Sequence, residues 1–242
     1  MEVDKNIEII NLGLWLNKEK TLIISDLHLG YEENLQQKGF FVPKQQSKLI
    51  IENLKKILNK IDPQKIIING DLKHDFGRIL RQEWKDVLKL IDFLLENCSE
   101  LILIRGNHDT ILEPIAEKRS IKVVSEYQIN DILIIHGDKL ITTKRESNKT
   151  KLKTIKTIII GHEHPAISFK EKGKIEKYKC FLKGKWKQKD LIVMPSFNPL
   201  LYGSEVVSEQ KFSPFLNNKK EFQVFVVSKE EIFDFGKVKD LK

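Results

Sequence analysis

The sequence predicts an α/β fold with an at least partly parallel sheet, and three features of its 242 residues lead to that prediction. Short apolar runs bounded by turn residues recur along the chain and are typical of buried strands. Between the earlier runs lie stretches whose apolar residues repeat at helical spacing. No Pro/Gly/Ser-rich linker interrupts the chain. Because strands that alternate with helices form βαβ units, we expect parallel pairing in the first half and a single domain over residues 1–242.

The expected elements follow one another in a simple order. Residues 21–26, 65–70 and 101–106 contain runs of Leu and Ile, as strands buried on both faces require. Helices are expected between them at 50–61 and 80–95, where apolar residues recur three and four positions apart. Further strands are expected at 131–137, 157–162, 191–196, 222–228 and 231–236. The second half should therefore be richer in strands than the first.

The net charge of +8 favours partners that carry phosphate groups. Basic residues dominate 139–156 and 170–189. The second stretch also contains three aromatic residues, Tyr178, Phe181 and Trp186. Lysines interleaved with aromatic rings can bind the backbone of a nucleic acid and stack on its bases. The same stretch also fits an ordinary solvated hairpin around Gly173 or Gly184, so both interpretations stay open.

Cysteine usage and the N-terminal residues indicate a reducing, cytoplasmic setting. Cys98 and Cys180 are the only cysteines, and neither belongs to a CxxC pair, so neither a disulfide framework nor a thiolate zinc site is indicated. The first ten residues lack the basic start, apolar centre and cleavage site of a signal peptide. No apolar run approaches the length of a membrane span, and we expect no membrane partner.

Polar side chains follow five of the apolar runs at the point where each run ends. In chain order they are Asp26 and His28, then Asp71, then Asn107, His108 and Asp109, then His136, then His162 and His164. All six histidines lie within a few residues of such an end, and the sixth is His74. Sites in α/β sheets form outside the carboxyl ends of strands. The pattern therefore predicts a metal site at one edge of the sheet.

Imidazole and carboxylate ligands suit divalent metals such as Mn, Fe, Co or Zn, and the absence of cysteine argues against a purely structural zinc. Taken singly, each residue has a simpler explanation, because strand-end Asp and Asn often cap helices and a lone His is often structural. The shared position of all six histidines outweighs those explanations. Other schemes fit worse: in HEHPA the second histidine of HExxH is missing and Pro165 would interrupt the helix, and no GxSxG or phosphate-loop motif is present.

The motifs DLHLG, NGDLKH, RGNHD, IIHGD and GHEHP follow one another from Asp26 to His164. They resemble the calcineurin-like metallophosphoesterases, whose pattern is D-x-H, G-D, G-N-H-[DE], H and G-H-x-H. DLHLG, GDLKHDFG and the late MPSFNPLLYG are most similar to an SbcD-related archaeal and bacterial group, which includes the endonuclease associated with DNA ligase in bacterial damage responses. The resemblance implies a two-layer mixed β-sandwich flanked by helices, with a two-metal site at one edge.

The resemblance also implies the ligands. One metal would be held by Asp26, His28, Asp71 and His164, and the other by Asp71, Asn107, His136 and His162. Asp71 would bridge them, because the two oxygens of a carboxylate can serve two metals. Two cations about 3.5–4 Å apart can activate a water and neutralise charge on the phosphate. Manganese is the expected metal, with Fe, Zn, Co or Mg as alternatives.

His108, Asp109 and His74 are the expected catalytic residues. By the same resemblance, His108 would stabilise the transition state or protonate the leaving oxygen, and Asp109 would orient its ring. His74 is interpreted as a histidine on the substrate side, with a solvent-facing loop residue as the alternative. Asn198 is expected in a turn that could approach the site, and Glu163 as a supporting or surface group.

The prediction that results is a metal-dependent hydrolase of phosphoric esters, and in particular a DNA-repair nuclease that cleaves phosphodiester bonds. The basic stretches favour a nucleic acid, with DNA preferred, and the resemblance suggests helicase or ligase partners. The alternative is a phosphatase or small-molecule phosphodiesterase acting on nucleotide, nucleotide-sugar or protein phosphates. A binding scaffold without metals would require missing ligands, and none is missing.

Overall fold

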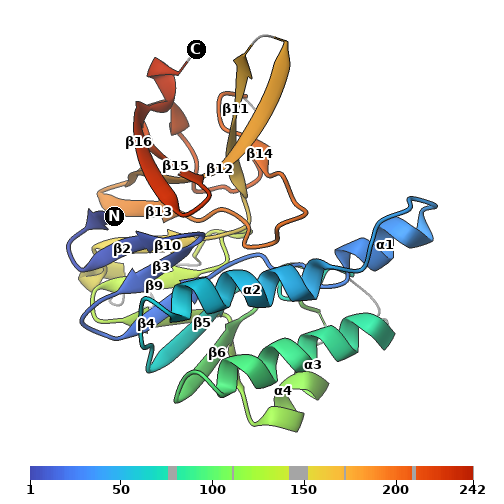
Figure 1. Cartoon of the computed structure of the whole chain (residues 1–242). Helices are drawn as coiled ribbons and strands as arrows, with labels where there is room; N and C mark the ends of the chain where they lie inside the picture. The colour runs from blue at the N-terminus through green and yellow to red at the C-terminus, as the bar shows by residue number, and fades with distance from the viewer. Residues whose placement is uncertain (76–80, 111, 142–151, 172, 209–210, 242) are drawn as a thin grey trace.

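The computed structural model describes residues 1–75, 81–110, 112–141, 152–171, 173–208 and 211–241. Within these residues it confirms a two-layer mixed β-sandwich, in which two sheets pack against each other and helices flank the first (Figure 1). None of the helices in these ranges combines the length and the apolar character needed to cross a membrane.

The first sheet runs in the order β1 to β7. Its strands are β1 (Glu2–Asp4), β2 (Ile7–Ile10), β3 (Gly13–Leu16), β4 (Thr21–Ile24), β5 (Lys65–Asn69), β6 (Glu100–Ile104) and β7 (Lys122–Val124). The pairs from β1 to β4 are antiparallel, and those from β4 to β7 are parallel. The helices are α1 (Tyr31–Gln37), α2 (Gln46–Leu58), α3 (Arg81–Leu95) and α4 (Glu113–Arg119). The expected βαβ units are therefore confirmed.

The second sheet runs β14-β11-β12-β13-β10-β9-β8, with β15 paired to β12 and β16 to β15. Its strands are β8 (Glu126–Ile129), β9 (Ile132–Ile135), β10 (Thr157–Ile160), β11 (Pro165–Glu171), β12 (Lys174–Trp186), β13 (Lys189–Val193), β14 (Ser204–Glu205), β15 (Gln223–Ser228) and β16 (Glu231–Lys237). β9, β10 and β13 are parallel, whereas β12 is antiparallel to its neighbours β11, β13 and β15. Two short 3-10 helices, η1 (Lys219–Glu221) and η2 (Val238–Asp240), flank β15 and β16.

The larger of two hydrophobic clusters joins the two sheets and the helices, and the smaller one lies with the second sheet. Ile23 and Ile67 of the first sheet belong to the same buried cluster as Ile159 and Ile192 of the second, and Leu54 of α2 packs into it. Burying one such side chain contributes about 1.5–3 kcal/mol relative to leaving it exposed. The core therefore fixes the positions of the strands whose ends carry the candidate site.

The lysine-rich stretch forms a hairpin, as one of the two interpretations expected. β11 and β12 pair on either side of Gly173, whose φ is +82°. Gly184 lies inside β12 instead of at a turn, and a Cβ there would collide with the ring of Phe222. Glycine is required at this second position for close packing and not for chain reversal.

The interpretation of this stretch as a surface on which bases stack is wrong for two of its three aromatic rings. Phe181 is fully buried and Trp186 is only 5 % exposed, because this part of β12 lies in the core of the second sheet. Tyr178 alone of the three is half-buried. Most of the other basic stretch, residues 142–151, lies outside the described residues.

Candidate metal centre

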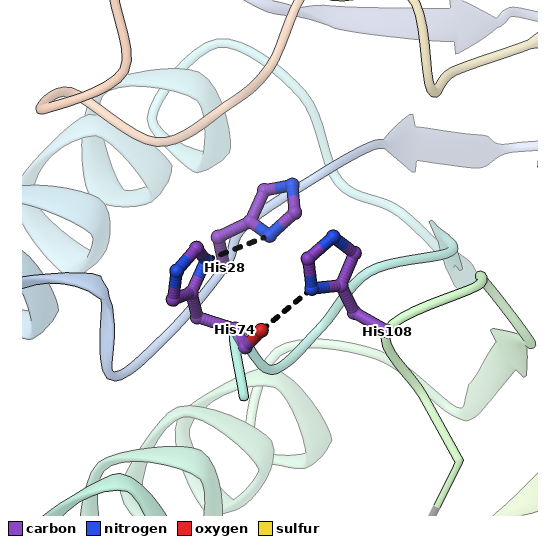
Figure 2. A group of neighbouring side chains, drawn as sticks. All are labelled: His28, His74 and His108. Atoms are coloured by element: carbon purple, nitrogen blue, oxygen red, sulfur yellow. Dashed lines mark hydrogen bonds between the residues drawn. The ribbon is translucent and has the colours of Figure 1, made fainter. Parts of the chain in front are cut away.

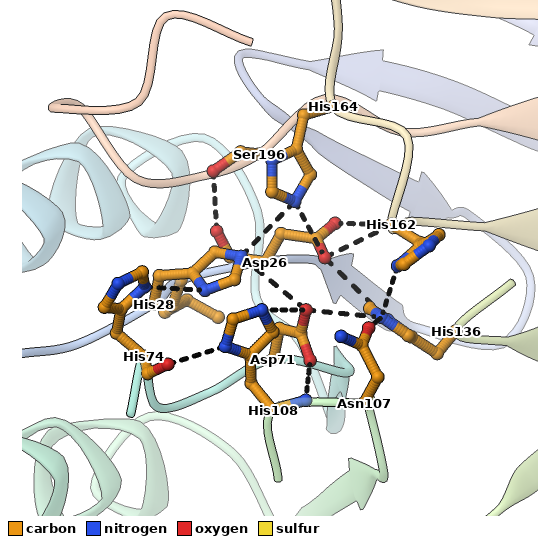
Figure 3. A network of polar contacts seen from close by, with 12 residues as sticks. Asp26, His28, Asp71, His74, Asn107, His108, His136, His162, His164 and Ser196 are labelled. Atoms are coloured by element: carbon orange, nitrogen blue, oxygen red, sulfur yellow. Dashed lines mark hydrogen bonds and ion pairs between the residues drawn. The ribbon is translucent and has the colours of Figure 1, made fainter. Parts of the chain in front are cut away.

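Five strands end at one edge of the fold, and every predicted ligand lies there. Asp26 and His28 follow β4, Asp71 follows β5, Asn107 follows β6, His136 follows β9, and His162 and His164 follow β10. His28, His74 and His108 lie together on one side of the group (Figure 2), and Figure 3 shows the whole network. Parallel pairing within each sheet brings these strand ends together.

Five of these residues have left-handed backbone conformations, which are uncommon in residues other than glycine. The angle φ is 56° at Asp26, 44° at His28, 48° at Asp71, 65° at His162 and 50° at His164. Such conformations cost about 1–3 kcal/mol each and persist only where surrounding contacts enforce them. Their concentration at the strand ends is typical of a functional site.

Two glycines allow the strand ends to approach one another. A Cβ at Gly106 would overlap the carboxylate and backbone of Asp71. A Cβ at Gly161 would overlap the side chains of Ser25 and Asp26. A larger residue at Gly106 would push apart the loops after β5 and β6 of the first sheet, and one at Gly161 would push apart loops of the two sheets.

The segment after β13 holds the backbone of the first motif. Ser196 Oγ donates a hydrogen bond to the carbonyl oxygen of Asp26 at 2.6 Å, and Asn198 Nδ2 donates to that of His28 at 3.5 Å. Ser196 and Asn198 are both buried. The sequence analysis did not identify Ser196 as a residue of the site. Only its position in the motif MPSFNPLLYG could have indicated this role.

Lys179 of β12 anchors this segment in turn. Its Nζ donates to the carbonyl oxygens of Ser196, at 2.7 Å, and Asn198. Burial of the ammonium lowers the pKa of Lys179 to about 7. Asn198 also serves the expected turn, because its Oδ1 accepts the N–H of Leu200 at 2.9 Å. No local pattern distinguishes Lys179 from the other lysines of its stretch.

The first cluster consists of Asp26, His28 and His164, whose candidate ligand atoms lie within 4.8 Å of one another. His164 Nε2 is 3.1 Å from Asp26 Oδ1 and 3.4 Å from His28 Nε2. Asp26 and His28 are buried, whereas His164 is partly exposed. The cluster is therefore reached from solvent on the His164 side.

The second cluster consists of Asp71, His136 and His162, again within 4.8 Å of one another. His136 Nε2 is 3.3 Å from Asp71 Oδ2 and 3.2 Å from His162 Nδ1. Asn107 joins this group, because its Oδ1 lies 3.0 Å from His136 Nε2. A neutral amide oxygen is thus added to the second cluster.

Asp71, which the resemblance implies as the shared ligand, lies between the two clusters. Its Oδ2 is 3.6 Å from His28 Nε2 and 3.3 Å from His136 Nε2. Its Oδ1 instead accepts the backbone N–H of His108 at 2.9 Å. One oxygen therefore faces both clusters, whereas the expectation gave one oxygen to each metal.

These donor atoms fit divalent metal ions. Metal–nitrogen bonds of about 2.0–2.1 Å at tetrahedral angles place neighbouring ligand atoms about 3.3 Å apart. The closest ligand atoms, 3.0 to 3.4 Å apart, match that spacing, and all ligand atoms of each cluster lie within 4.8 Å of one another. Nitrogen and oxygen donors without thiolate suit Mn, Fe, Co and Zn. Two buried carboxylates, Asp26 and Asp71, also need positive charge nearby.

The protonation states suit metal binding as well. Burial opposes ionisation of Asp71, yet the hydrogen bond and charge of His136 outweigh it and hold the pKa of this carboxyl below its ordinary value. The pKa of Asp26 is lowered because His164 outweighs burial there. Burial, with the charge of His164, lowers the pKa of His28 to about 3. Ionised carboxylates and neutral imidazoles are the forms that bind metals.

His136 shows how strongly the centre attracts positive charge. Burial alone would lower its pKa, but the hydrogen bond to Asp71 and the charges of Asp26 and Asp71 raise the pKa of His136 to about 9. A bound cation would take the place of that proton.

His108 lies beside the clusters, but its ring is held by a different group from the one expected. His108 Nδ1 donates to the carbonyl oxygen of His74 at 2.6 Å. Its Nε2 lies on the side of Asp71, 4.0 Å from Oδ2. The main chain of His74, and not the carboxylate of Asp109, therefore sets the tautomer of His108.

Asp109 joins two loops instead. Its buried carboxylate accepts backbone N–H groups from Leu72, Lys73 and Gly106, at 3.3, 3.3 and 3.0 Å. Burial raises the pKa of Asp109 to about 6, and the negative charge of Asp71 adds to the rise. Because its carboxylate lies among these amides, Asp109 ties the loop after β5 to the loop after β6 and supports the site from behind.

His74 lies beside His28 and His108, whose rings contact each other as well as the ring of His74 (Figure 2). Its Nδ1 lies 3.4 Å from His28 Nδ1, and its ring stacks on His108 with centroids 5.5 Å apart. Burial, with the charge of His108, lowers the pKa of His74 to about 4. Candidate ligand atoms of His28, His74 and His108 also lie within 4.8 Å of one another.

Glu163, between the two histidines of GHEHP, is a buried supporting group. Its Oε2 accepts the backbone N–H groups of Phe212 and Ser213, both at 2.8 Å. It therefore ties the turn after β10 to a segment fifty residues further along the chain.

Comparison with known proteins agrees with this arrangement. A model of the calcineurin-like phosphoesterase family matches residues 19–226. Among solved structures, the nuclease MPE of Pseudomonas putida is similar, with a TM-score of 0.59 and 18 % identity over 92 % of this chain and 91 % of that one. Vps29 of Cryptosporidium parvum has a TM-score of 0.40 and 14 % identity over 90 % of this chain and 97 % of that one. A search of curated proteins finds no match.

At 18 % identity, the similarity to the Pseudomonas nuclease is a similarity of fold alone. The family match spans most of the chain, and both clusters lie inside the matched residues. This chain therefore belongs to the calcineurin-like phosphoesterase family and is a hydrolase of phosphoester bonds.

Proposed function

We propose that the chain is a phosphodiesterase that depends on two divalent metals. Asp26, His28 and His164 would hold one metal, and Asn107, His136 and His162 the other, with Asp71 shared. The observation that carries the proposal is the position of Asp71 Oδ2, which faces His28 at 3.6 Å and His136 at 3.3 Å. One oxygen that faces both clusters supports the proposal that they form a single centre.

Bound metals would activate a water and neutralise charge on the phosphate. Asn107 offers a neutral oxygen, so that only Asp26 and Asp71 add negative charge beside the substrate. His108 has its Nδ1–H held by the carbonyl oxygen of His74 and its Nε2 on the Asp71 side. When the ring carries a second proton, on Nε2, His108 can pass that proton to the leaving oxygen and return to the neutral form that keeps its Nδ1–H.

For the substrate we favour a nucleic acid, and DNA in particular. The net charge of +8 supports binding to a phosphate backbone, and the similar fold from Pseudomonas putida is that of a nuclease. The motifs shared with the SbcD-related group support a role in DNA repair beside a helicase or ligase. Cys98 and Cys180 are free thiols, which supports a cytoplasmic location.

A cleft of about 680 Å³ in the second sheet offers aromatic rings to the bases. Its lining includes four aromatic rings and three charged groups, which are Phe169, Tyr178, Phe233, Phe235, Lys170, Lys174 and Glu176, and Glu176 accepts a hydrogen bond from the hydroxyl of Tyr178. Phe233 and Phe235 are 44 % and 39 % exposed. Phe169 follows His164 by five residues along β11, which is about 16 Å at the rise of a strand. Exposed rings beside lysines are typical of sites for single-stranded nucleic acid, which we propose as the occupant.

Replacing both Phe233 and Phe235 by Ala should weaken binding of a single-stranded oligonucleotide about 10-fold or more, because one stacked base contributes about 1–3 kcal/mol. Fluorescence anisotropy measures the affinity. Hydrolysis of bis(p-nitrophenyl) phosphate should be unchanged, and Phe41→Ala, an exposed ring outside the cleft, is the control. If the double variant binds the oligonucleotide as tightly as the wild type but changes its oligomeric state, the cleft is a contact between protein chains instead.

Chelator-stripped protein tests the proposed activity. We expect it to be inactive and to regain turnover with Mn²⁺, with Mg²⁺, Zn²⁺, Fe²⁺ and Co²⁺ compared in parallel. Substrates should include phosphate monoesters, simple diesters, and end-labelled single- and double-stranded DNA and RNA. Hydrolysis of monoesters or mononucleotides without cleavage of any polymer would contradict the nuclease and favour the phosphatase or small-molecule alternative.

A further inference from the structure

The two ring nitrogens of His28 have different surroundings. Nε2 faces the first cluster, 3.4 Å from His164 Nε2 and 3.6 Å from Asp71 Oδ2. Nδ1 lies on the other side of the ring, 3.4 Å from His74 Nδ1 (Figure 2). A neutral imidazole carries a single N–H. Nε2 is therefore free to bind a metal only when the proton is on Nδ1, where it meets His74.

Metal-binding histidines almost always donate their second N–H to an acceptor, which fixes the tautomer and the orientation of the ring. His136 of the second cluster has such an acceptor, because its Nδ1 lies 3.3 Å from the carbonyl oxygen of Asn69. For His28, the group that lies next to Nδ1 is the imidazole of His74. His74 Nδ1 accepts this hydrogen bond when its own proton is on Nε2.

The main chain of His74 is itself held in place. Its N–H lies 2.8 Å from the carbonyl oxygen of Leu29 and 3.0 Å from Oε1 of Glu83, which is fully buried. Its carbonyl oxygen accepts the Nδ1–H of His108 at 2.6 Å. The backbone is therefore anchored at both groups, and the ring is held by its contacts with His28, Tyr31 and His108.

We propose that His74 is a positioning residue of the metal centre, with one role for its side chain and another for its main chain. The ring accepts the Nδ1–H of His28 and so keeps Nε2 of that ligand free for the metal. The carbonyl oxygen accepts the Nδ1–H of His108 and keeps its Nε2 towards the centre. The inference rests on the proposed two-metal function, and it places His74 behind a ligand instead of against the substrate.

Mutation separates the two roles, because a change of side chain leaves the carbonyl oxygen in place. His74→Ala should weaken one of two Mn²⁺-binding events about 10–100-fold and leave the other unchanged. His74→Asn should restore most of that affinity, because the Asn Oδ1 can accept the same hydrogen bond. Calorimetric titration of chelator-stripped protein measures both events, and circular dichroism checks that each variant is folded.

At saturating Mn²⁺, His74→Ala should regain most of the wild-type kcat, because His108 stays held. Wild-type affinity for both metals in folded His74→Ala would overturn the proposal, and so would folded His74→Asn that binds no better than His74→Ala. A kcat that stays low with unchanged metal affinity would assign His74 to the substrate.

Metal stoichiometry separates positioning from direct ligation. Three metals bound by the wild type, with the third lost in His74→Ala, would make His28, His74 and His108 a ligand set and overturn the proposal. Two metals bound by the wild type support it. Because the readout is metal binding, a protein that binds two metals but cleaves no phosphodiester would contradict the proposed function alone.

Discussion

Asp71→Asn is expected to impair both metal sites together and to lower kcat/KM by about 10³-fold or more, because bound metals supply several kcal/mol of transition-state stabilisation. Asp71 Oδ2 is the atom that faces both clusters, at 3.6 Å from His28 and 3.3 Å from His136. The amide keeps the size of the carboxylate but removes its charge. A change at one side chain therefore acts on two sites.

Metal content after dialysis, measured by atomic emission, gives the occupancy of the Asp71→Asn variant. Hydrolysis of bis(p-nitrophenyl) phosphate gives its kcat/KM. Asp92→Asn is the matched control, because that carboxylate is paired with Arg119 on the helical side of the first sheet, away from the strand ends. Loss of only one metal would contradict the shared position of Asp71.

His108→Ala is expected to keep both metals and to lose about 10²–10⁴-fold in turnover, the usual contribution of a general acid. His108 belongs to neither of the two clusters that Asp71 joins. Its Nδ1 is held by the carbonyl oxygen of His74, and its Nε2 lies 4.0 Å from Asp71 Oδ2. Steady-state kinetics at saturating metal, with metal content as the control, measure the effect.

The leaving group separates proton transfer from charge stabilisation in the His108→Ala variant. A nucleoside hydroxyl needs a proton as it leaves, whereas p-nitrophenolate does not. The loss should therefore be large for an oligonucleotide and small for bis(p-nitrophenyl) phosphate. Equal losses on both substrates would assign His108 to charge stabilisation, and full activity on both would remove it from the chemistry.

Local patterns predicted the central strands of both sheets and the two longer helices, but not β1, β2, β3, β7, β8 or β14, nor α1 and α4. β4, β5 and β6 are runs of Leu and Ile that only a doubly covered sheet can bury, and they form at the expected places. The apolar spacing of 50–61 and 80–95 likewise corresponds to α2 and α3, within a few residues at either end. The convergence of the ligands also follows from the sequence, because parallel strands end at the same edge.

Predictions from local patterns were wrong where the burial or direction of a side chain depends on residues far away in the chain. Tyr178, Phe181 and Trp186 share one basic stretch, yet Phe181 and Trp186 are buried because β12 extends into the core beside β13 and β15. Asp109 follows His108 directly, yet its carboxylate meets the backbone after β5. Adjacency in sequence does not determine which way a buried side chain is directed.

The sequence by itself determined the α/β elements, the family motifs and the set of residues from Asp26 to His164 that meet at one edge. These follow from hydrophobic periodicity and from motif spacing, which act over short stretches of chain. Only the tertiary structure decided that one oxygen of Asp71 faces both clusters, that Lys179 and Ser196 hold the first motif from behind, and that His74 contacts both His28 and His108. Hydrogen bonds between residues far apart in the chain depend on how the two sheets pack, and no local pattern records that packing.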